Sequence, residues 1–580
     1  MKGLKSIYSV KGWLVVLMVF FGTVAWAQQT EEKQEVEQQR PVTIDSFDVV
    51  RDYRPILADA VKIRRSPDMI NKRSYMPKLS YQDIMDQKLD INTGLHVLDL
   101  KERPFSVREN ILPNYVKVGI GNFNTILAEG YFAYEDFVDM RFGGFVKHLS
   151  QKGELEAQKF SRQEVGVFGR RVLPQFTIDG MLGYNRYGTN FYGDPVIGNG
   201  TPVNPDKAPQ TFNDIYFSGE LTSNTQAEDE DALSYSAKVN AYAYNSSAFD
   251  AKETSFVLSS YLNKRMRFFN AGVNLTLDIN NMDGMQNPIT GASTINNSYA
   301  IINPYIRFKG DNYAITLGGN LIPEFGDSTS FNIFPSAQVD FSLVPGYVYL
   351  FGGVEGTVNK GSYKQLATEN PYLGPNQFIQ NTVERLSFHG GIKGNAGATF
   401  GYKAKAFYKQ LEHLPLFALN PENLFMYDVI YDGDGDDQVK HVGIEGEINV
   451  RLSELVNLGG RLNIDQYTLV NEQEAWNLPK MRLTGMARFT ISEKLYIDAE
   501  ALFQGQTYAK AYPELPGTQM DYRKETLPAF FDLSASAEYK ATKNLGLFVK
   551  ANNMLNTTYE RYLYYPKVGF NILGGLNFSF

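Results

Sequence analysis

The 580-residue sequence predicts an all-β protein, in which one transmembrane antiparallel β-barrel of about 22 strands follows a short irregular N-terminal arm. Three observations predict this fold. Apolar and polar residues alternate with a period of two in segments about ten residues long. Short turns and long loops alternate between these segments, and the last segment ends the chain on an aromatic residue.

The composition suits strands that face lipid on one side and water on the other. The chain has 39 Phe, 36 Tyr and 50 Gly, yet hydrophobic residues make up only 43% of it. A polytopic helical membrane protein is excluded, because it would need repeated apolar runs of about 20 residues. The absence of Cys excludes a disulfide-linked scaffold and a cysteine-ligated metal site. The net charge of −8 gives a nucleic-acid partner no electrostatic support.

Residues 1–27 have the pattern of a secretory signal peptide. Three lysines precede a single apolar run over residues 12–25, and Ala25 and Ala27 supply the small side chains that a signal peptidase requires. The alternative is a retained membrane anchor. The run is short for a membrane span, and the residues that follow it are mixed in charge, so we expect cleavage after Ala27.

Residues 28–113 are expected to form a periplasmic arm, partly disordered. The stretch 28–40 has no hydrophobic stripe, and residues 41–113 are irregular and interrupted by Pro. The barrel is therefore predicted to span residues 114–580.

Alternation is clearest in three segments: Phe269–Asn280, Leu495–Phe503 and Phe531–Lys540. Successive side chains of a strand point to opposite faces, so each segment is apolar on one face and hydrated on the other. Strands of a soluble sandwich also alternate, but they are usually about five or six residues long. Segments of about ten residues suit tilted strands that cross a hydrocarbon core.

The connections alternate in length, which is typical of an outer-membrane barrel. Short turns occur at residues 309–312 and 540–544, and long loops at residues 360–384 and 410–440. An open sheet would leave unpaired backbone groups in lipid, so the strands must close on themselves.

The last predicted strand alternates up to the C-terminal residue. Its apolar positions are Phe570, Ile572, Leu576, Phe578 and Phe580. Such a strand resembles the signal by which bacterial outer-membrane proteins are recognised, so the barrel-assembly machinery is an expected partner during biogenesis. The alternative is an edge strand of a soluble protein.

The residues before this strand resemble the C-terminus of TonB-dependent receptors. They comprise an Asn-Leu-Asn-type stretch at residues 552–559, then Tyr565-Pro566 and Gly569. The resemblance is to barrels of Bacteroidota-type bacteria, among which relatives lacking the plug domain are frequent. It implies a barrel in the outer membrane of a Gram-negative bacterium, surrounded by its lipids. Residues 28–113 are too short for the plug domain of a full receptor, which argues against gating by TonB.

An acidic loop is the sharpest local feature of the sequence. Asp432, Asp434, Asp436 and Asp437 could surround a hard cation such as Ca²⁺ with oxygen ligands. A helix-flanked calcium loop would carry Gly and Glu at positions where this loop has Asp437 and Gly443. The alternative is a solvated acidic loop tip without a bound ion, and no other cofactor is expected.

Charged residues on the polar faces of the predicted strands should line the lumen. They are Asp498, Glu500, Glu538, Lys403 and Lys405. Such residues tune selectivity in an open pore, or hold an arm or plug in a closed one.

No catalytic constellation emerges, so we do not expect an enzyme. The five His fit no metal-protease pattern, and Gly326-Asp327-Ser328 lacks the strand–turn–helix context of a hydrolase nucleophile. The leading hypothesis is solute passage across the outer membrane, passive or partner-gated. The alternative is an occluded accessory barrel that scaffolds surface lipoproteins or other envelope proteins.

Overall fold

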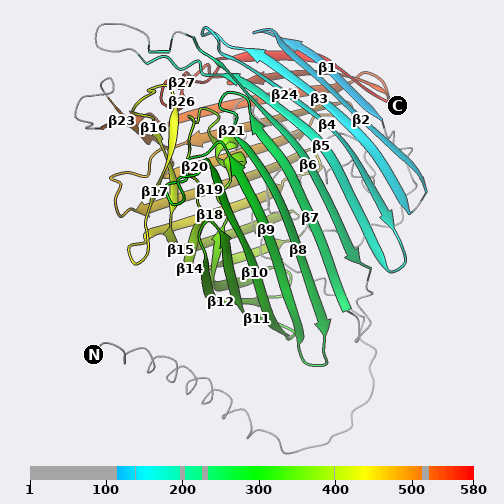
Figure 1. Ribbon diagram of the computed structural model, residues 1–580. Helices are drawn as coiled ribbons and strands as arrows, with labels where there is room; N and C mark the ends of the chain where they lie inside the picture. The colour runs from blue at the N-terminus through cyan, green and yellow to red at the C-terminus, as the bar shows by residue number, and fades with distance from the viewer. Residues whose placement is uncertain are drawn as a thin grey trace, which may run out of the picture. The chain divides into compact units, whose positions relative to one another are not determined.

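The computed structural model describes residues 114–137, 139–195, 203–204, 206–224, 233–397, 399–512 and 522–580. Within them, 22 strands form one sheet (Figure 1). The first half of the barrel comprises β1 (Tyr115–Gly121), β2 (Thr125–Phe137), β3 (Met140–Lys152), β4 (Lys159–Val172), β5 (Phe176–Asn190), β6 (Pro209–Ser223), β7 (Leu233–Ser246), β8 (Lys252–Arg265), β9 (Asn270–Asp283), β10 (Thr294–Lys309) and β11 (Tyr313–Gly326). The second half comprises β12 (Ser330–Val344), β13 (Val348–Asn359), β14 (Thr382–Ala396), β15 (Phe400–Glu412), β18 (Val439–Arg451), β19 (Val456–Thr468), β20 (Met481–Thr490), β21 (Leu495–Gln504), β24 (Phe530–Lys540), β25 (Leu545–Asn552) and β28 (Asn571–Ser579).

Every barrel strand pairs antiparallel with its neighbours, and the first strand closes the sheet against the last. Tyr115 of β1 lies opposite Ser579 of β28, and Gly121 lies opposite Leu573. The closed sheet has no edge strand with unpaired backbone groups. Strands can lie in lipid only under this condition, because the hydrocarbon core offers no water to pair with those groups. The predicted all-β fold with about 22 strands is confirmed.

The outer face of the barrel is apolar. Val146, Val165 and Ile215 lie on this face of β3, β4 and β6 and are 46%, 48% and 56% exposed. Residues on the opposite face of these strands point into the barrel. This exposed apolar surface is the one that faces the hydrocarbon core of the outer membrane. No helix in the described part of the chain is both long enough and apolar enough to cross a membrane.

The C-terminal strand lies in this apolar face, as its alternation predicts. β28 pairs with β25 on one side and β1 on the other. The five apolar positions predicted for this strand, in β28 and directly beside it, are exposed: Phe570, Ile572, Leu576, Phe578 and Phe580.

The two rims of the barrel differ in the length of their connections. One rim carries turns such as residues 310–312 and 541–544, and here Asn114 and Phe580 exchange two backbone hydrogen bonds of 3.1 and 3.0 Å. The other rim, called here the long-loop end, carries connections such as 360–381 and 413–438. This is the asymmetry expected from the sequence, and it makes the long-loop end the outer side of the barrel.

The long loops contain the remaining elements. These are α3 (Tyr363–Glu369) and the strands β16 (Leu414–Leu419), β17 (Tyr427–Asp432), β22 (Thr507–Ala511), β23 (Arg523–Leu527), β26 (Glu560–Tyr562) and β27 (Tyr565–Pro566). The six strands form three small hairpins, and Figure 1 shows β16, β17, β23, β26 and β27 gathered at one end of the barrel. The predicted signal peptide with its cleavage residues Ala25 and Ala27, and the predicted arm, lie outside the described residues.

Candidate functional site at the long-loop end

The acidic residues predicted to line the lumen lie on two adjacent strands. Asp498 and Glu500 are on β21 and Glu538 is on β24, opposite in face to the exposed side chains of Phe531 and Tyr539. Asp498 is held by a two-point contact with Arg488, whose Nε lies 2.6 Å from Oδ1 and whose second guanidinium nitrogen lies 3.1 Å from Oδ2. Asp498 is therefore a paired charge of the lumen wall.

The predicted basic residues lie in a separate part of the wall. Lys403 and Lys405 are on β15, and β18, β19 and β20 separate them from β21. Lys405 forms a 2.9 Å ion pair with Glu445, while Lys403 lies opposite Glu447 on β18. The structure thus does not bring the predicted acidic and basic residues together into one site.

The acidic loop is arranged as a turn. Asp432 is fully buried, and its carboxylate accepts hydrogen bonds from the backbone N–H groups of Val470 and Asn471 at 2.8 and 2.7 Å. Asp434 and Asp437 exchange two backbone hydrogen bonds and are exposed, as is Asp436. In the described part of the chain, no group of three or more His, Cys, Asp or Glu residues could hold a metal ion. Calcium binding stays a prediction, with this geometry giving it no support.

Asp327 has a structural position in its loop. Its carboxylate accepts hydrogen bonds from the side chain of Asn287 at 2.6 Å and from the backbone of Asn296 at 2.8 Å. The carboxylate next to Ser328 therefore fixes the connection between β11 and β12.

The long loops share one aromatic core, which we call the loop cap. It consists of the buried loop residues Phe191, Tyr192, Tyr363, Leu366, Ala367, Tyr372, Leu373, Ile379, Phe417, Leu419, Tyr427, Val429, Ala511, Tyr562 and Tyr565. The same cluster includes residues at the outer ends of barrel strands: Phe212, Tyr242, Tyr244, Met282 and Ile295. Apolar burial of this extent stabilises the loops against one another and against the wall.

Three tyrosines join different loops at the centre of the cap. The rings of Tyr372 and Tyr565 stack with centroids 3.5 Å apart, and Tyr192 packs edge-on against both. The Tyr192 hydroxyl donates to the backbone oxygen of Pro566 at 3.0 Å, and the Tyr565 hydroxyl donates to that of Phe425. Buried tyrosines thus satisfy their hydroxyls while packing their rings.

The loop 360–381 forms the part of the cap that reaches the lumen wall. Its short helix α3 begins after Ser362, whose side-chain oxygen accepts a hydrogen bond from the backbone N–H of Gln365, and it ends at Glu369. Ser at the N-cap position and the helix-favouring residues that follow explain why this stretch is helical. Leu366 and Ala367 of α3 enter the aromatic core.

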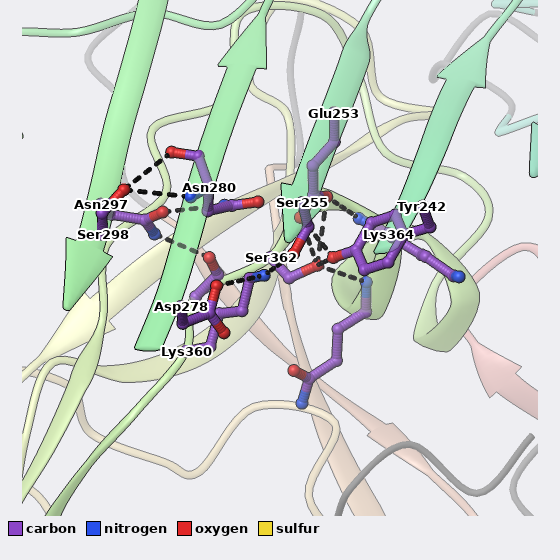
Figure 2. A network of polar contacts seen from close by, with 12 residues as sticks. Tyr242, Glu253, Ser255, Asp278, Asn280, Asn297, Ser298, Lys360, Ser362 and Lys364 are labelled. Carbon is purple, nitrogen blue, oxygen red and sulfur yellow. Dashed lines mark hydrogen bonds and ion pairs between the residues drawn. The ribbon is translucent and has the colours of Figure 1, made fainter. Parts of the chain in front are cut away.

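Glu253 of β8 holds the start of this helix against the wall (Figure 2). Its carboxylate accepts hydrogen bonds from the Ser362 hydroxyl at 2.8 Å, the Lys364 backbone N–H at 2.6 Å and the Tyr242 hydroxyl at 2.7 Å. Only 1% of Glu253 is exposed. A buried carboxylate is tolerated because three donors surround it.

Two lysines of the same loop bind neighbouring acids on the wall. Lys364 Nζ lies 2.8 Å from Asp214 of β6, and Lys360 Nζ lies 2.9 Å from Asp278 of β9. Lys360 also donates to the hydroxyl of Ser255 on β8. Figure 2 shows Lys360 and Ser362 beside Ser255 and Asp278 of the wall. We use the name loop latch for the contacts between this loop and the wall. The loop contributes Lys360, Ser362 and Lys364, and the wall contributes Asp214, Glu253, Ser255 and Asp278.

The loop latch was not among the residues predicted from the sequence. The sequence indicated a long loop at 360–384, and Ser362 followed by helix-favouring residues is a helix-start signal that was available there. Nothing in the sequence indicates which wall acids its lysines meet, because the two contacts join residues that are 82 and 150 positions apart.

Comparisons with known proteins place the fold. No protein-family profile and no curated protein sequence matches the chain. The barrel is similar to that of the FrpB iron transporter from Neisseria meningitidis, with a TM-score of 0.60 and 11% identity over 80% of this chain and 81% of that one. It is also similar to the ferric enterobactin receptor PfeA of Pseudomonas aeruginosa (TM-score 0.56, 12% identity, 80% of each chain).

A third similar structure is the ferric-catecholate import receptor Fiu of E. coli, with a TM-score of 0.59 and 10% identity over 81% of this chain and 82% of that one. These structures are TonB-dependent receptors, so the expected resemblance of fold is confirmed. At these identities the likeness shows the barrel fold, which is that of Gram-negative outer-membrane receptors. A plug domain is not evident in the described residues.

Proposed function

We propose that this protein carries a solute across the outer membrane through its barrel, and that the loop cap closes the outer mouth until a ligand or partner releases it. The fold supports passage, since a 22-strand barrel with charged groups on its inner wall is wide enough for a hydrated path. The observation that carries the proposal is the loop latch, through which one loop is held to the inner wall by ionic contacts.

Ionic contacts suit a releasable closure. A charge partner that leaves can be replaced by water or by another ion, so the bound and released states differ by a modest free energy. The contacts from Lys360 and Lys364 both lie in one continuous loop, so they can be made and broken together. A loop that moves in this way would admit solute without unfolding the barrel.

Conductance of the purified barrel in a planar bilayer tests this proposal. We expect wild-type protein to conduct weakly, and Lys360→Ala/Lys364→Ala to show large steady openings. Lys524→Ala is a matched control, because Lys524 pairs with Glu474 on the exposed side of the long loops. If the double variant folds and remains as silent as wild type, the proposal of a latch-gated pore is wrong.

A second candidate is an occluded barrel that scaffolds other envelope proteins. The aromatic core favours it, because a cap that buries rings from four loops could be a permanent closure. This alternative would be supported if neither the wild-type protein nor the latch variant conducts in the bilayer, and if envelope proteins co-purify with the barrel in a fixed ratio. The barrel-assembly machinery, surface lipoproteins and outer-membrane lipids remain the predicted partners, and TonB is not among them.

A further inference from the structure

The wall side of the loop latch has the chemistry of an ammonium-binding site. Asp214, Glu253 and Asp278 stand on β6, β8 and β9 and are 4%, 1% and 4% exposed. The ring of Tyr242 lies beside them, with its centroid 4.1 Å from Lys364 Nζ and 5.3 Å from Lys360 Nζ. Carboxylates next to an aromatic face are a recurrent arrangement for binding ammonium groups.

The wall offers an acceptor that the loop does not use. Asn280 lies two residues after Asp278 on β9, on the same lumen face, and only 1% of it is exposed (Figure 2). Its side-chain oxygen has no hydrogen-bond partner among the described residues. A buried acceptor without a donor is costly, and an additional N–H donor bound there would satisfy it.

The spacing of the acids favours an extended organic cation over a metal ion. No three carboxylates of the described residues converge closely enough to ligate one metal. Instead, each of the two lysines reaches a different acid, Lys364 meeting Asp214 and Lys360 meeting Asp278. The wall therefore separates its acidic groups in the way that suits a molecule with two ammonium groups.

We infer that these wall groups are a recognition site for primary ammonium groups, and that Lys360 and Lys364 occupy it in the closed state. A diamine or a larger solute with two ammonium groups would compete with the two lysines and release the loop. The inference rests on the proposed function, since it names the class of solute that opens the proposed gate.

Bilayer conductance of wild-type protein with cadaverine added on the outer side tests the inference. We expect cadaverine to raise the open fraction about tenfold or more, because it shifts the closed–open equilibrium by binding only the open wall. Potassium chloride at equal ionic strength and uncharged pentanediol are the matched additives and should not do so. Asp214→Asn/Asp278→Asn removes the same acids from the latch, so it should be open without cadaverine and should bind none in calorimetry.

Calorimetry gives a measurement that does not depend on conduction. Lys360→Ala/Lys364→Ala should bind cadaverine about tenfold or more tightly than wild type, because the internal competitor has been removed. Equal weak heats in both proteins, in samples shown to be folded by circular dichroism, would overturn the ammonium site.

The two proposals fail differently. If the double lysine variant conducts but cadaverine acts no more strongly than potassium chloride, the ammonium site is wrong and the latch-gated pore stands. If the double lysine variant is folded and silent, the latch-gated pore itself is wrong, whatever the calorimetry shows.

Discussion

Replacing Glu253 by Gln should release the loop 360–381 from the wall. The carboxylate accepts hydrogen bonds through both oxygens, and its Oε2 accepts the backbone N–H of Lys364 at 2.6 Å. In Glu253→Gln one oxygen becomes an amide nitrogen, which cannot accept. The variant therefore loses a hydrogen bond to a charged group or leaves a buried N–H without an acceptor.

The size of the effect follows from these contacts. A hydrogen bond to a charged group contributes about 1.5–3 kcal/mol, and a buried donor left unsatisfied costs about 1–3 kcal/mol. We therefore expect loop attachment to weaken by about 1–3 kcal/mol. At about 1.4 kcal/mol for each factor of ten, the released fraction rises roughly 5- to 140-fold.

Thiol labelling can measure the released fraction. The natural chain has no Cys, so Ala367→Cys places a single thiol on α3 at a position that is 1% exposed in the cap. Its reaction with a polyethylene-glycol maleimide should accelerate in Glu253→Gln by the factor above, since labelling requires the loop to leave.

Asp250→Asn is the matched control for this labelling. Asp250 lies in the turn between β7 and β8, near Glu253 in the chain, and its exposed carboxylate forms an ion pair with Lys252. This variant should label at the parental rate. If Glu253→Gln also labels at the parental rate, the carboxylate does not hold the loop and the reasoning fails.

Three further predictions concern the lumen, the C-terminus and the cap. In the Lys360→Ala/Lys364→Ala background, Asp498→Asn should shift ion selectivity toward anions, because the wall loses a negative charge beside Arg488; unchanged reversal potentials would contradict this. Deleting Phe580 should lower the amount of assembled barrel in the outer membrane severalfold, as judged by heat-modifiable migration on gels, whereas a normal yield would exclude the terminal residue from recognition. Burial raises the pKa of Tyr372 well above its ordinary value of about 10, so cap stability should be full below about pH 10 and fall at higher pH as the released tyrosine ionises; thiol labelling of Ala367→Cys that stays flat on alkalinisation would contradict it.

The barrel could be predicted from the sequence because its signals are local. In Phe531–Lys540, each apolar residue is two positions from the next, and the structure places Phe531 and Tyr539 on the exposed face with Glu538 buried on the other. The signal at Phe570–Phe580 is equally local, and β28 faces lipid with the same residues that the alternation identified.

The sequence predicted the arrangement of the site residues less completely than it predicted the barrel. The sequence placed Asp498 and Lys405 on lumen faces but could not show that β18, β19 and β20 separate their strands. The acidic loop at Asp432 had the composition of a cation site, while the fold uses its buried carboxylate to hold the backbone at Val470. Composition identifies groups that could bind an ion, and only backbone geometry decides whether they meet.

The sequence by itself determined a closed barrel with a lipid face, a hydrated lumen and long loops on one rim, because strand periodicity and lipid contact act on neighbouring residues. The tertiary structure alone decided that the loops share an aromatic core and that Lys364 meets Asp214, which is 150 positions away in the chain. These segments come together when the sheet closes, and the alternation of apolar and polar residues within each segment does not predict their contact. The physical reason is that a strand's face depends on local spacing, whereas a loop's partner depends on how the whole barrel closes.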